Sequence, residues 1–216
     1  MRIDVWSDVV CPWCYLGKKR LEKALDGLDF GSEVEVRWRA FQLDPTAGTE
    51  PKDLRTAIDR KYGPGAFDGM SKRLGQLGED LGIDYRFDLA QRVTSVPALM
   101  LVAWIEENEG IELADKMHDR LFRAYFTEGE NIADSANLVE WAVEIGVDRE
   151  LAGEAVATGA GREAVVRDLE AAADKDITGV PAFVIEDAAL IPGAQDVETM
   201  QQILTRMHDR LSAAEG

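Results

Sequence analysis

Cys11 and Cys14 are the feature of this sequence that most constrains its fold. They are the only cysteines in the chain, and only Pro12 and Trp13 separate them. A strand-like stretch, residues 3–7, ends just before the pair, and an apolar pattern with helical spacing begins straight after it. A cysteine pair at such a strand-to-helix junction is typical of a redox-active dithiol. Free N–H groups and the helix dipole stabilise a thiolate on the first cysteine, and the second lies one turn further on.

Composition and charge narrow the class of protein. Of the 216 residues, 46% are hydrophobic, which is enough apolar material for a globular core in one large domain or two small ones. No apolar run approaches the roughly 20 residues that a membrane-spanning helix needs. The net charge of -17 argues against nucleic acids and anionic membranes as partners, because phosphates would be repelled.

The N-terminus leaves no room for a signal peptide, because residues 1–4 lead directly into the first predicted strand. We therefore expect a cytoplasmic protein, and in the cytosol a close cysteine pair is more often catalytic or metal-binding than structural. We expect no metal, since a metal site needs about four ligands and two cysteines do not supply them. We expect the two histidines, His118 and His208, to be surface or hydrogen-bonded side chains.

The first 40 residues have the pattern of a strand, a helix and a second strand. Residues 2–7 are expected to form a buried strand and residues 11–27 a helix. Residues 33–40 alternate polar and apolar side chains, which favours a strand with one buried face at the edge of a sheet. A strand–helix–strand unit implies that the two strands run parallel.

The middle of the chain is dominated by helical patterns. From Pro51 to about Gly146, apolar residues recur at helical spacing and glycines punctuate the stripes. Two more helices are predicted after this block, one that Asp148 caps and one over residues 162–174. In the second of these helices, the side chains expected to face inward are Val165, Val166 and Leu169.

Strand character returns near the C-terminus. Residues 182–185 and 189–191 are expected to form a hairpin, followed by a helix that Asp196 caps. The element order is therefore β-α-β, a helical block, and α-β-β-α, which predicts an α/β fold of thioredoxin type with an insertion. Most large aromatic side chains are expected in the core, with some lining a cleft: Trp38, Phe41, Trp104, Phe122, Tyr125, Phe126 and Trp141.

Two motifs carry a resemblance to a known family. Cys11-Pro12-Trp13-Cys14, taken with Gly179-Val180-Pro181-Ala182-Phe183, resembles the thioredoxin superfamily, and the helical insertion narrows the resemblance to its DsbA-like branch. Residues 7–17 resemble the FrnE-like subfamily of DsbA-like oxidoreductases. Other segments that resemble this subfamily are residues 38–43, 121–126 and 193–195.

The resemblance implies a thioredoxin fold with a large all-helical insertion. The thioredoxin-like domain would be discontinuous, comprising residues 1–45 and 155–216, and the insertion domain would comprise residues 46–154. The insertion is expected to act as a lid that selects what reaches Cys11. The sequence departs from the family pattern at Leu99, where the family often has a histidine, so the polar contact of that histidine is lost.

The cysteine pair predicts a dithiol–disulfide exchange reaction. Cys11 is expected to be the nucleophile, whose thiolate attacks a substrate disulfide, and Cys14 then resolves the mixed disulfide. By resemblance, Pro181 completes the site, with a cis peptide bond after Val180 that lies against Cys11. The Val180 main chain would then pair with an extended substrate segment.

Further residues are expected to tune the site or bind substrate. Pro12 suits the first turn of a helix, and neither Pro12 nor Trp13 carries a charge that would stabilise a thiolate, so we expect a less oxidising site than one with a histidine between the cysteines. Asp8 is either a proton carrier and charge neighbour for the cysteines or a turn or helix-capping residue. The resemblance adds Phe41 and Gln42 to the residues expected to tune the site or bind substrate.

The sequence therefore predicts a protein disulfide reductase or isomerase with no bound cofactor beyond a Cys11–Cys14 disulfide. Its partners would be protein or small-molecule disulfides and thiols, with glutathione as a possible co-substrate, and the sequence leaves open whether it is a monomer or a homodimer. One alternative is a glutathione-dependent transferase or isomerase of the kappa class or the 2-hydroxychromene-2-carboxylate isomerase type, which generally have serine at the Cys11 position. A second alternative is a non-enzymatic chaperone or interaction module.

Overall fold

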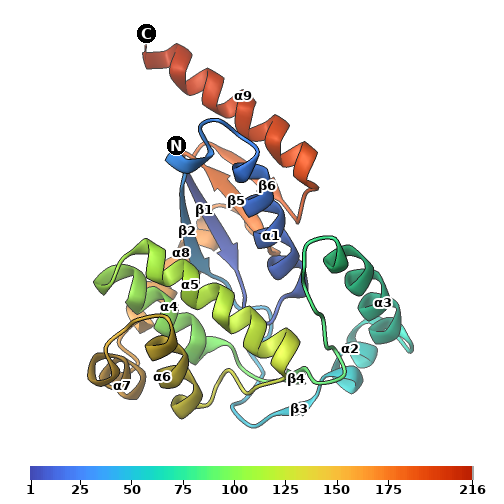
Figure 1. Ribbon diagram of the computed structural model, residues 1–216. Coiled ribbons are helices and arrows are strands. Elements are labelled where there is room, and N and C mark those ends of the chain that lie inside the picture. Colours follow the sequence, from blue (N-terminus) through green and yellow to red (C-terminus); the bar gives the residue numbers. More distant parts are fainter. Residues whose placement is uncertain (216) are drawn as a thin grey trace.

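The strand β1 (Arg2–Ser7) is one of the two inner strands of the main sheet, and all its side chains after Arg2 are buried. The computed structural model describes residues 1–215. β1 pairs in parallel with β2 (Glu35–Ala40) and antiparallel with β5 (Ala182–Ile185), which pairs antiparallel with β6 (Ala189–Pro192). The strand order is β2-β1-β5-β6 (Figure 1). β2 is thus an edge strand, as its alternating sequence predicted, and it is parallel to β1, as the strand–helix–strand order predicted.

Alternate residues of β1 supply the two faces of the sheet. Ile3 and Val5 join one apolar cluster with residues of α1 (Pro12–Asp26) and α9 (Val197–Glu215), and these two helices contact each other. Trp6 belongs to a smaller cluster on the other side, which includes residues of α8 (Arg162–Asp174) and the segment after it. The sheet is therefore covered on both faces, which is why its central strands contain few polar residues.

α8 is joined to the sheet by hydrogen bonds as well as by apolar contact. The indole N–H of Trp6 donates to the Asp168 main-chain oxygen at 2.9 Å, and the Ala40 amide donates to the Asp168 carboxylate at 2.8 Å. The bounds of α8 agree with the predicted range of residues 162–174. Asp148 and Asp196 cap the N-termini of α7 and α9, as predicted. Val166 was wrongly expected to face inward, because it is 46% exposed, whereas Val165 is buried and Leu169 is partly buried against the core.

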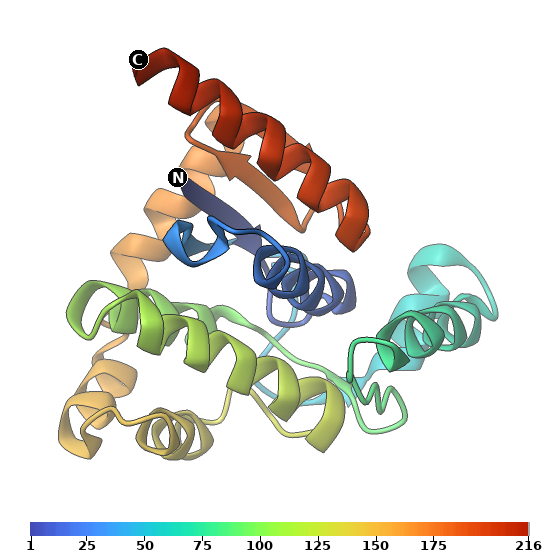
Figure 2. The same ribbon diagram turned by 45° about the horizontal axis from the view of Figure 1, so that its top comes forward.

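The helical block lies beyond one end of the sheet. In both views α2 and α3 stand on the opposite side of this block from α6 and α7 (Figures 1 and 2). The sequence patterns did not predict a small antiparallel pair of strands or a short π-helical turn inside the block. The elements between β2 and α8 are β3 (Lys52–Asp53), α2 (Leu54–Tyr62), α3 (Ala66–Glu79), β4 (Gln91–Arg92), α4 (Val96–Asn108), α5 (Ile111–Arg123), a π-helical turn (Ala124–Glu128), α6 (Ser135–Glu144) and α7 (Arg149–Thr158).

The block packs directly on the thioredoxin-like part, because α4 and α5 both contact β2. The division of the chain into residues 1–45 with 155–216 and residues 46–154 stays a prediction. Between residues 1 and 215, no helix combines the length and the apolar character that crossing a membrane requires.

The environment of His118 contradicts the prediction that both histidines are surface or hydrogen-bonded side chains. Its ring is 1% exposed, stacks on Trp38 with ring centroids 4.0 Å apart, and meets the ring of Phe122 edge-on. Neither ring nitrogen has a hydrogen-bond partner among the residues that the structure describes. His208 is about a third exposed and stacks on Phe30, in agreement with the prediction.

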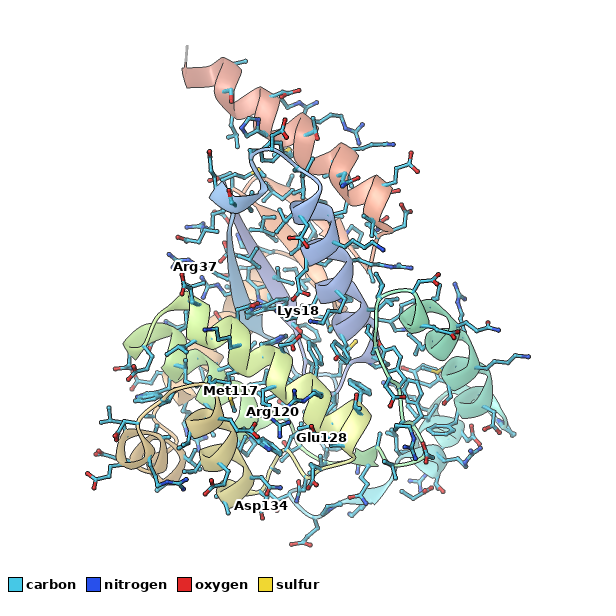
Figure 3. The ribbon with its side chains drawn as sticks, in the orientation of Figure 1. Lys18, Arg37, Met117, Arg120, Glu128 and Asp134 are labelled. Atoms are coloured by element: carbon cyan, nitrogen blue, oxygen red, sulfur yellow. The ribbon has the colours of Figure 1, made fainter. Side chains whose placement is uncertain are left out.

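A buried lysine lies beside this histidine, between α1 and α5 (Figure 3). Lys18 is 1% exposed, forms ion pairs with Asp115 and Glu22, and places its ammonium 4.9 Å from the centre of the Trp38 ring. Burial and the Lys18 charge lower the pKa of His118 well below its usual value of 6.5. The imidazole is therefore held neutral in the folded protein.

The His118→Phe variant should gain stability relative to the wild type as the pH falls. Below pH 6.5 the unfolded chain protonates His118 whereas the folded protein does not, so the unfolded state binds more protons and wild-type stability falls. Phenylalanine removes this penalty, and the variant's advantage in free energy of unfolding should be about 2 kcal/mol larger at pH 5 than at pH 8. Urea denaturation at the two pH values measures the difference. The control is His208→Phe, whose ring solvent reaches, and an advantage for His118→Phe that does not change with pH would contradict the assignment.

Candidate active site

The two cysteines lie where β1 passes into α1. Cys11 is the residue that caps the N-terminus of α1, and Pro12 is the first residue inside the helix, where its missing N–H costs no hydrogen bond. The amides of Cys14 and Tyr15 both donate to the Cys11 carbonyl, at 3.0 and 3.2 Å. Cys11 is thus at the helix N-terminus and Cys14 is one turn further in, as the sequence predicted.

Both cysteines are free thiols in this structure, and both are largely buried. Cys11 is 4% exposed and Cys14 is 1% exposed. Burial, followed by the neighbouring Cys11 sulfur, raises the pKa of the Cys14 thiol well above its usual value of 9.0. Cys14 is therefore protonated at neutral pH, and it must lose a proton before it can act as a nucleophile.

The segment before β5 forms the other wall of the site. The Val180–Pro181 peptide bond is cis, as the resemblance implied, and the Cys11 thiol donates to the Val180 carbonyl at 3.7 Å. Gly17 permits this close packing, because a Cβ atom on Gly17 would lie 3.0 Å from the Pro181 ring and 3.3 Å from Phe183. The structure thus brings Cys11, Val180 and Pro181 together from positions about 170 residues apart in the chain.

Asp8 lies directly behind the cysteines and is fully buried. Its carboxylate accepts hydrogen bonds from the main-chain amides of Leu43 at 2.8 Å and Val10 at 3.3 Å. Its main chain hydrogen-bonds the Cys14 sulfur, and its carbonyl accepts the Cys11 amide at 2.9 Å. Asp8 is thus a turn residue and does not cap α1. Burial raises the pKa of its carboxyl from 3.8 to about 6, although hydrogen bonds from Leu43 and Ser95 oppose the shift.

Phe41 and Gln42 lie on the segment that follows β2, and both are half-buried. The Phe41 amide donates to the Ser7 carbonyl at 3.0 Å, which keeps this segment beside the end of β1. Phe41 and Val180 pack against the same apolar cluster, so Phe41 lies near the site. Leu99, at the position of the family histidine, is 3% exposed and belongs to the main core.

The helical block contributes two residues that the sequence did not single out. The Tyr85 hydroxyl donates to the Pro12 carbonyl at 2.5 Å, and its ring packs against Gly78 of α3, where a Cβ atom would lie 2.8 Å away. The guanidinium carbon of Arg73, also on α3, lies 5.5 Å from the centre of the Trp13 ring. Nothing in the local pattern marks these residues, because their roles arise from tertiary packing. Among residues 1–213, no group of three or more potential metal ligands gathers.

Sequence comparison finds a matching family and a similar protein. A model of the family described as DSBA-like thioredoxin domain matches residues 2–205. The uncharacterized protein YwbO of Bacillus subtilis (strain 168) is 30% identical over 212 residues, which cover 95% of this chain and 96% of that protein.

Solved structures agree with the sequence matches. The probable DsbA oxidoreductase SCO1869 of Streptomyces coelicolor has a TM-score of 0.87 and is 33% identical, with 95% of this chain and 89% of that chain covered. The cytosolic disulfide reductase DsbM of Pseudomonas aeruginosa, solved with GSH, has a TM-score of 0.70 and is 21% identical, with 97% and 100% covered. At 21% identity the second likeness shows a shared fold only.

The Asp8→Asn variant should become more stable relative to the wild type as the pH rises. The folded protein keeps the Asp8 proton up to about pH 6, whereas the unfolded chain releases it near 3.8. The folded state therefore binds more protons in this range, and the wild type loses stability as the pH rises through 6. The difference in free energy of unfolding should move in favour of the variant by about 2 kcal/mol between pH 4 and pH 8.

Chemical denaturation across this pH range measures the change for Asp8→Asn. The matched control is Asp196→Asn, because hydrogen bonds from Thr199 lower the pKa of Asp196. For Asp196→Asn, the difference in free energy of unfolding should move in the opposite direction, so that the wild type is favoured at high pH. A pH-independent difference between Asp8→Asn and the wild type would mean that the Asp8 carboxyl is not shifted.

Proposed function

The chain belongs to the DSBA-like thioredoxin domain family, and on that premise we propose that it is a thiol–disulfide oxidoreductase that acts through Cys11 and Cys14. One observation carries the proposal. The thiol of Cys11, at the N-terminus of α1, lies 3.7 Å from the Val180 carbonyl, and Cys14 is one helical turn behind it. A dithiol at the junction of a strand and a helix, next to the Val180 segment, is an arrangement suited to disulfide exchange.

The reduced enzyme would react in two exchange steps. The Cys11 thiolate attacks one sulfur of a substrate disulfide, forms a mixed disulfide and releases one substrate thiol. Cys14 then loses its proton and attacks Cys11, which forms the Cys11–Cys14 disulfide and releases the second thiol. The substrate gains two electrons and two protons, and the dithiol loses them. The reverse sequence oxidises a substrate dithiol, and an incomplete sequence isomerises disulfides.

Asp8 is proposed to accept the proton that Cys14 releases. The raised pKa of the Cys14 thiol means that the second step needs a base. The Asp8 main chain lies against Cys14, and its buried carboxyl has a pKa of about 6, so it is ionised at neutral pH. Phe41, Gln42 and the Val180 main chain are proposed to hold the substrate while these steps occur.

We propose a cytoplasmic location and no cofactor beyond the cysteine pair. The structure of DsbM, which is named a cytosolic disulfide reductase and was solved with GSH, supports both the location and glutathione as a thiol co-substrate. The natural substrates would be protein or small-molecule disulfides. A glutathione transferase or isomerase function has no role for Cys14, and Leu99 offers no polar group to such a reaction.

The Cys11→Ser variant should lose disulfide reductase activity, because it removes the nucleophile of the first step. In an insulin-reduction assay the rate should fall to the uncatalysed level. A scrambled-ribonuclease assay tests isomerisation with the same variant. Activity that survives Cys11→Ser would overturn the proposal, and tight glutathione binding without any disulfide exchange would favour the isomerase alternative.

The Cys14→Ser variant serves as the matched partner of Cys11→Ser. It keeps the first step and loses the second, so a mixed disulfide with substrate should accumulate on Cys11 and appear in the intact mass. Both substitutions exchange sulfur for oxygen at nearly buried positions one turn apart, so a difference between them reports on chemistry rather than on folding. Holdase activity that neither variant alters would instead support a chaperone role.

The Asp8→Asn variant should slow the second exchange step without slowing the first. In the wild type, release of the mixed disulfide should become faster as the pH rises through about 6, because Asp8 ionises and can accept the proton. In the variant this inflection should be absent, and the rate at pH 7 should fall by about a hundredfold. Rapid-quench measurement of the mixed disulfide follows both steps. An unchanged pH profile would remove Asp8 from proton transfer.

A further inference from the structure

α3 places a positive charge over the cysteine motif. The guanidinium carbon of Arg73 is 5.5 Å from the centre of the Trp13 ring, and Trp13 lies between the two cysteines in the sequence. The position of α3 is well defined, because the next residue, Leu74, is buried in the main core. Arg73 is itself exposed, and the packing of its helix places its guanidinium beside the Trp13 ring.

The Arg73 guanidinium contacts the Trp13 ring but forms no ion pair within the described chain. Among residues 1–213, no carboxylate lies within ion-pair distance of Arg73. Ten of the sixteen arginines form an ion pair within the described part of the chain, and Arg73 is among the six that do not. Arg55 of the neighbouring helix α2, for example, pairs with Asp68 of α3 at 2.7 Å. A planar guanidinium with free N–H groups is suited to bind a carboxylate from outside.

We propose that Arg73 is a specificity-determining residue that selects disulfides carrying a carboxylate close to the sulfur atoms. This inference rests on the proposed oxidoreductase function and names its substrate class. A substrate sulfur that reaches Cys11 brings its flanking groups over Pro12 and Trp13, where the Arg73 guanidinium lies. The overall charge of -17 repels anions, so a local cation at this point is what admits an anionic disulfide.

The test follows the oxidation of the reduced dithiol by small symmetric disulfides. The reduced enzyme and one symmetric disulfide give the oxidised enzyme, with a Cys11–Cys14 bond, and two thiols. Three small disulfides of similar length differ in charge: dithiodipropionate is a dianion, bis(2-hydroxyethyl) disulfide is neutral, and cystamine is a dication. Acid quenching and counting of the remaining enzyme thiols give the second-order rate constant for each.

The Arg73→Gln variant should lose the preference for the anionic disulfide. Relative to the wild type, its rate with dithiodipropionate should fall roughly three- to tenfold, as expected for one charge pair at the protein surface. Its rate with the neutral disulfide should stay the same, and its rate with cystamine should rise. The loss should shrink at high ionic strength, because salt screens exposed charges. Arg73→Lys should recover part of the preference.

Lys72→Gln is the matched control, because it removes the same charge from the adjacent, exposed position of α3. It should leave the ratio of the three rates unchanged. If Lys72→Gln and Arg73→Gln change the ratio equally, the effect is one of net charge and the inference fails. If Arg73→Gln slows all three disulfides equally, Arg73 is only structural and the inference also fails. The equilibrium of the dithiol with glutathione should not differ between Arg73→Gln and the wild type.

Failure of the inference is distinguishable from failure of the proposed function. A wild-type protein that oxidises with none of the three disulfides contradicts the function itself, whereas equal rates with all three contradict only the role of Arg73. A second arm identifies the source of the carboxylate, by comparing disulfide-linked peptides with glutamate or glutamine beside the cysteine. An Arg73-dependent preference for the glutamate peptide assigns acidic protein segments, and a preference limited to dithiodipropionate assigns small carboxylates.

Discussion

Gly17 lets α1 pass directly over Pro181, and this close approach is the contact on which the site depends. A Cβ atom at position 17 would lie 3.0 Å from the Pro181 ring and 3.3 Å from Phe183, so these side chains would have to shift by a few tenths of an ångström to admit it. Pro181 follows Val180, whose carbonyl accepts a hydrogen bond from the Cys11 thiol, so the Gly17 contact lies next to the dithiol. The contact therefore joins the first and last parts of the chain in one core, which is also where β1 pairs with β5. The packing of α1 thus places the Cys11 thiol beside the segment that leads into β5.

Burial determines how the titratable groups around α1 behave. Asp8, Cys14 and His118 are all inaccessible to solvent, and in each case loss of hydration is the largest cause of the shifted pKa. The direction differs with the chemistry, since burial disfavours the charged form of each group. The acid and the thiol are therefore shifted upward and the imidazole downward. Lys18 is also buried, but its ammonium forms ion pairs with Asp115 and Glu22. The positive charge of Lys18 is therefore balanced by neighbouring carboxylates.

The parts of the fold that sequence patterns predicted are those that local interactions determine. β2 has an alternating pattern because one face is buried, and α8 has the predicted bounds because its apolar spacing is regular. His118 was assigned wrongly although it lies four residues before Phe122, on the buried stripe of α5, because an imidazole was expected to find a partner. The cysteine motif and Val180–Pro181 were located by pattern and resemblance. Tyr85 and Arg73 were not, because their contacts with the motif exist only after α3 has packed.

The helical block therefore does more than cover the site. Tyr85 is held against Gly78 of α3 and donates to the Pro12 carbonyl, so the position of α3 is linked to the first turn of α1 by a hydrogen bond. That first turn carries the dithiol, so Tyr85 connects the helical block to the part of α1 that holds Cys11 and Cys14. The thioredoxin-like part supplies the thiols and the Val180 main chain, and the block supplies the groups that contact the motif from outside. The contacts of Tyr85 and Arg73 thus both fall on the motif of four residues at which α1 begins.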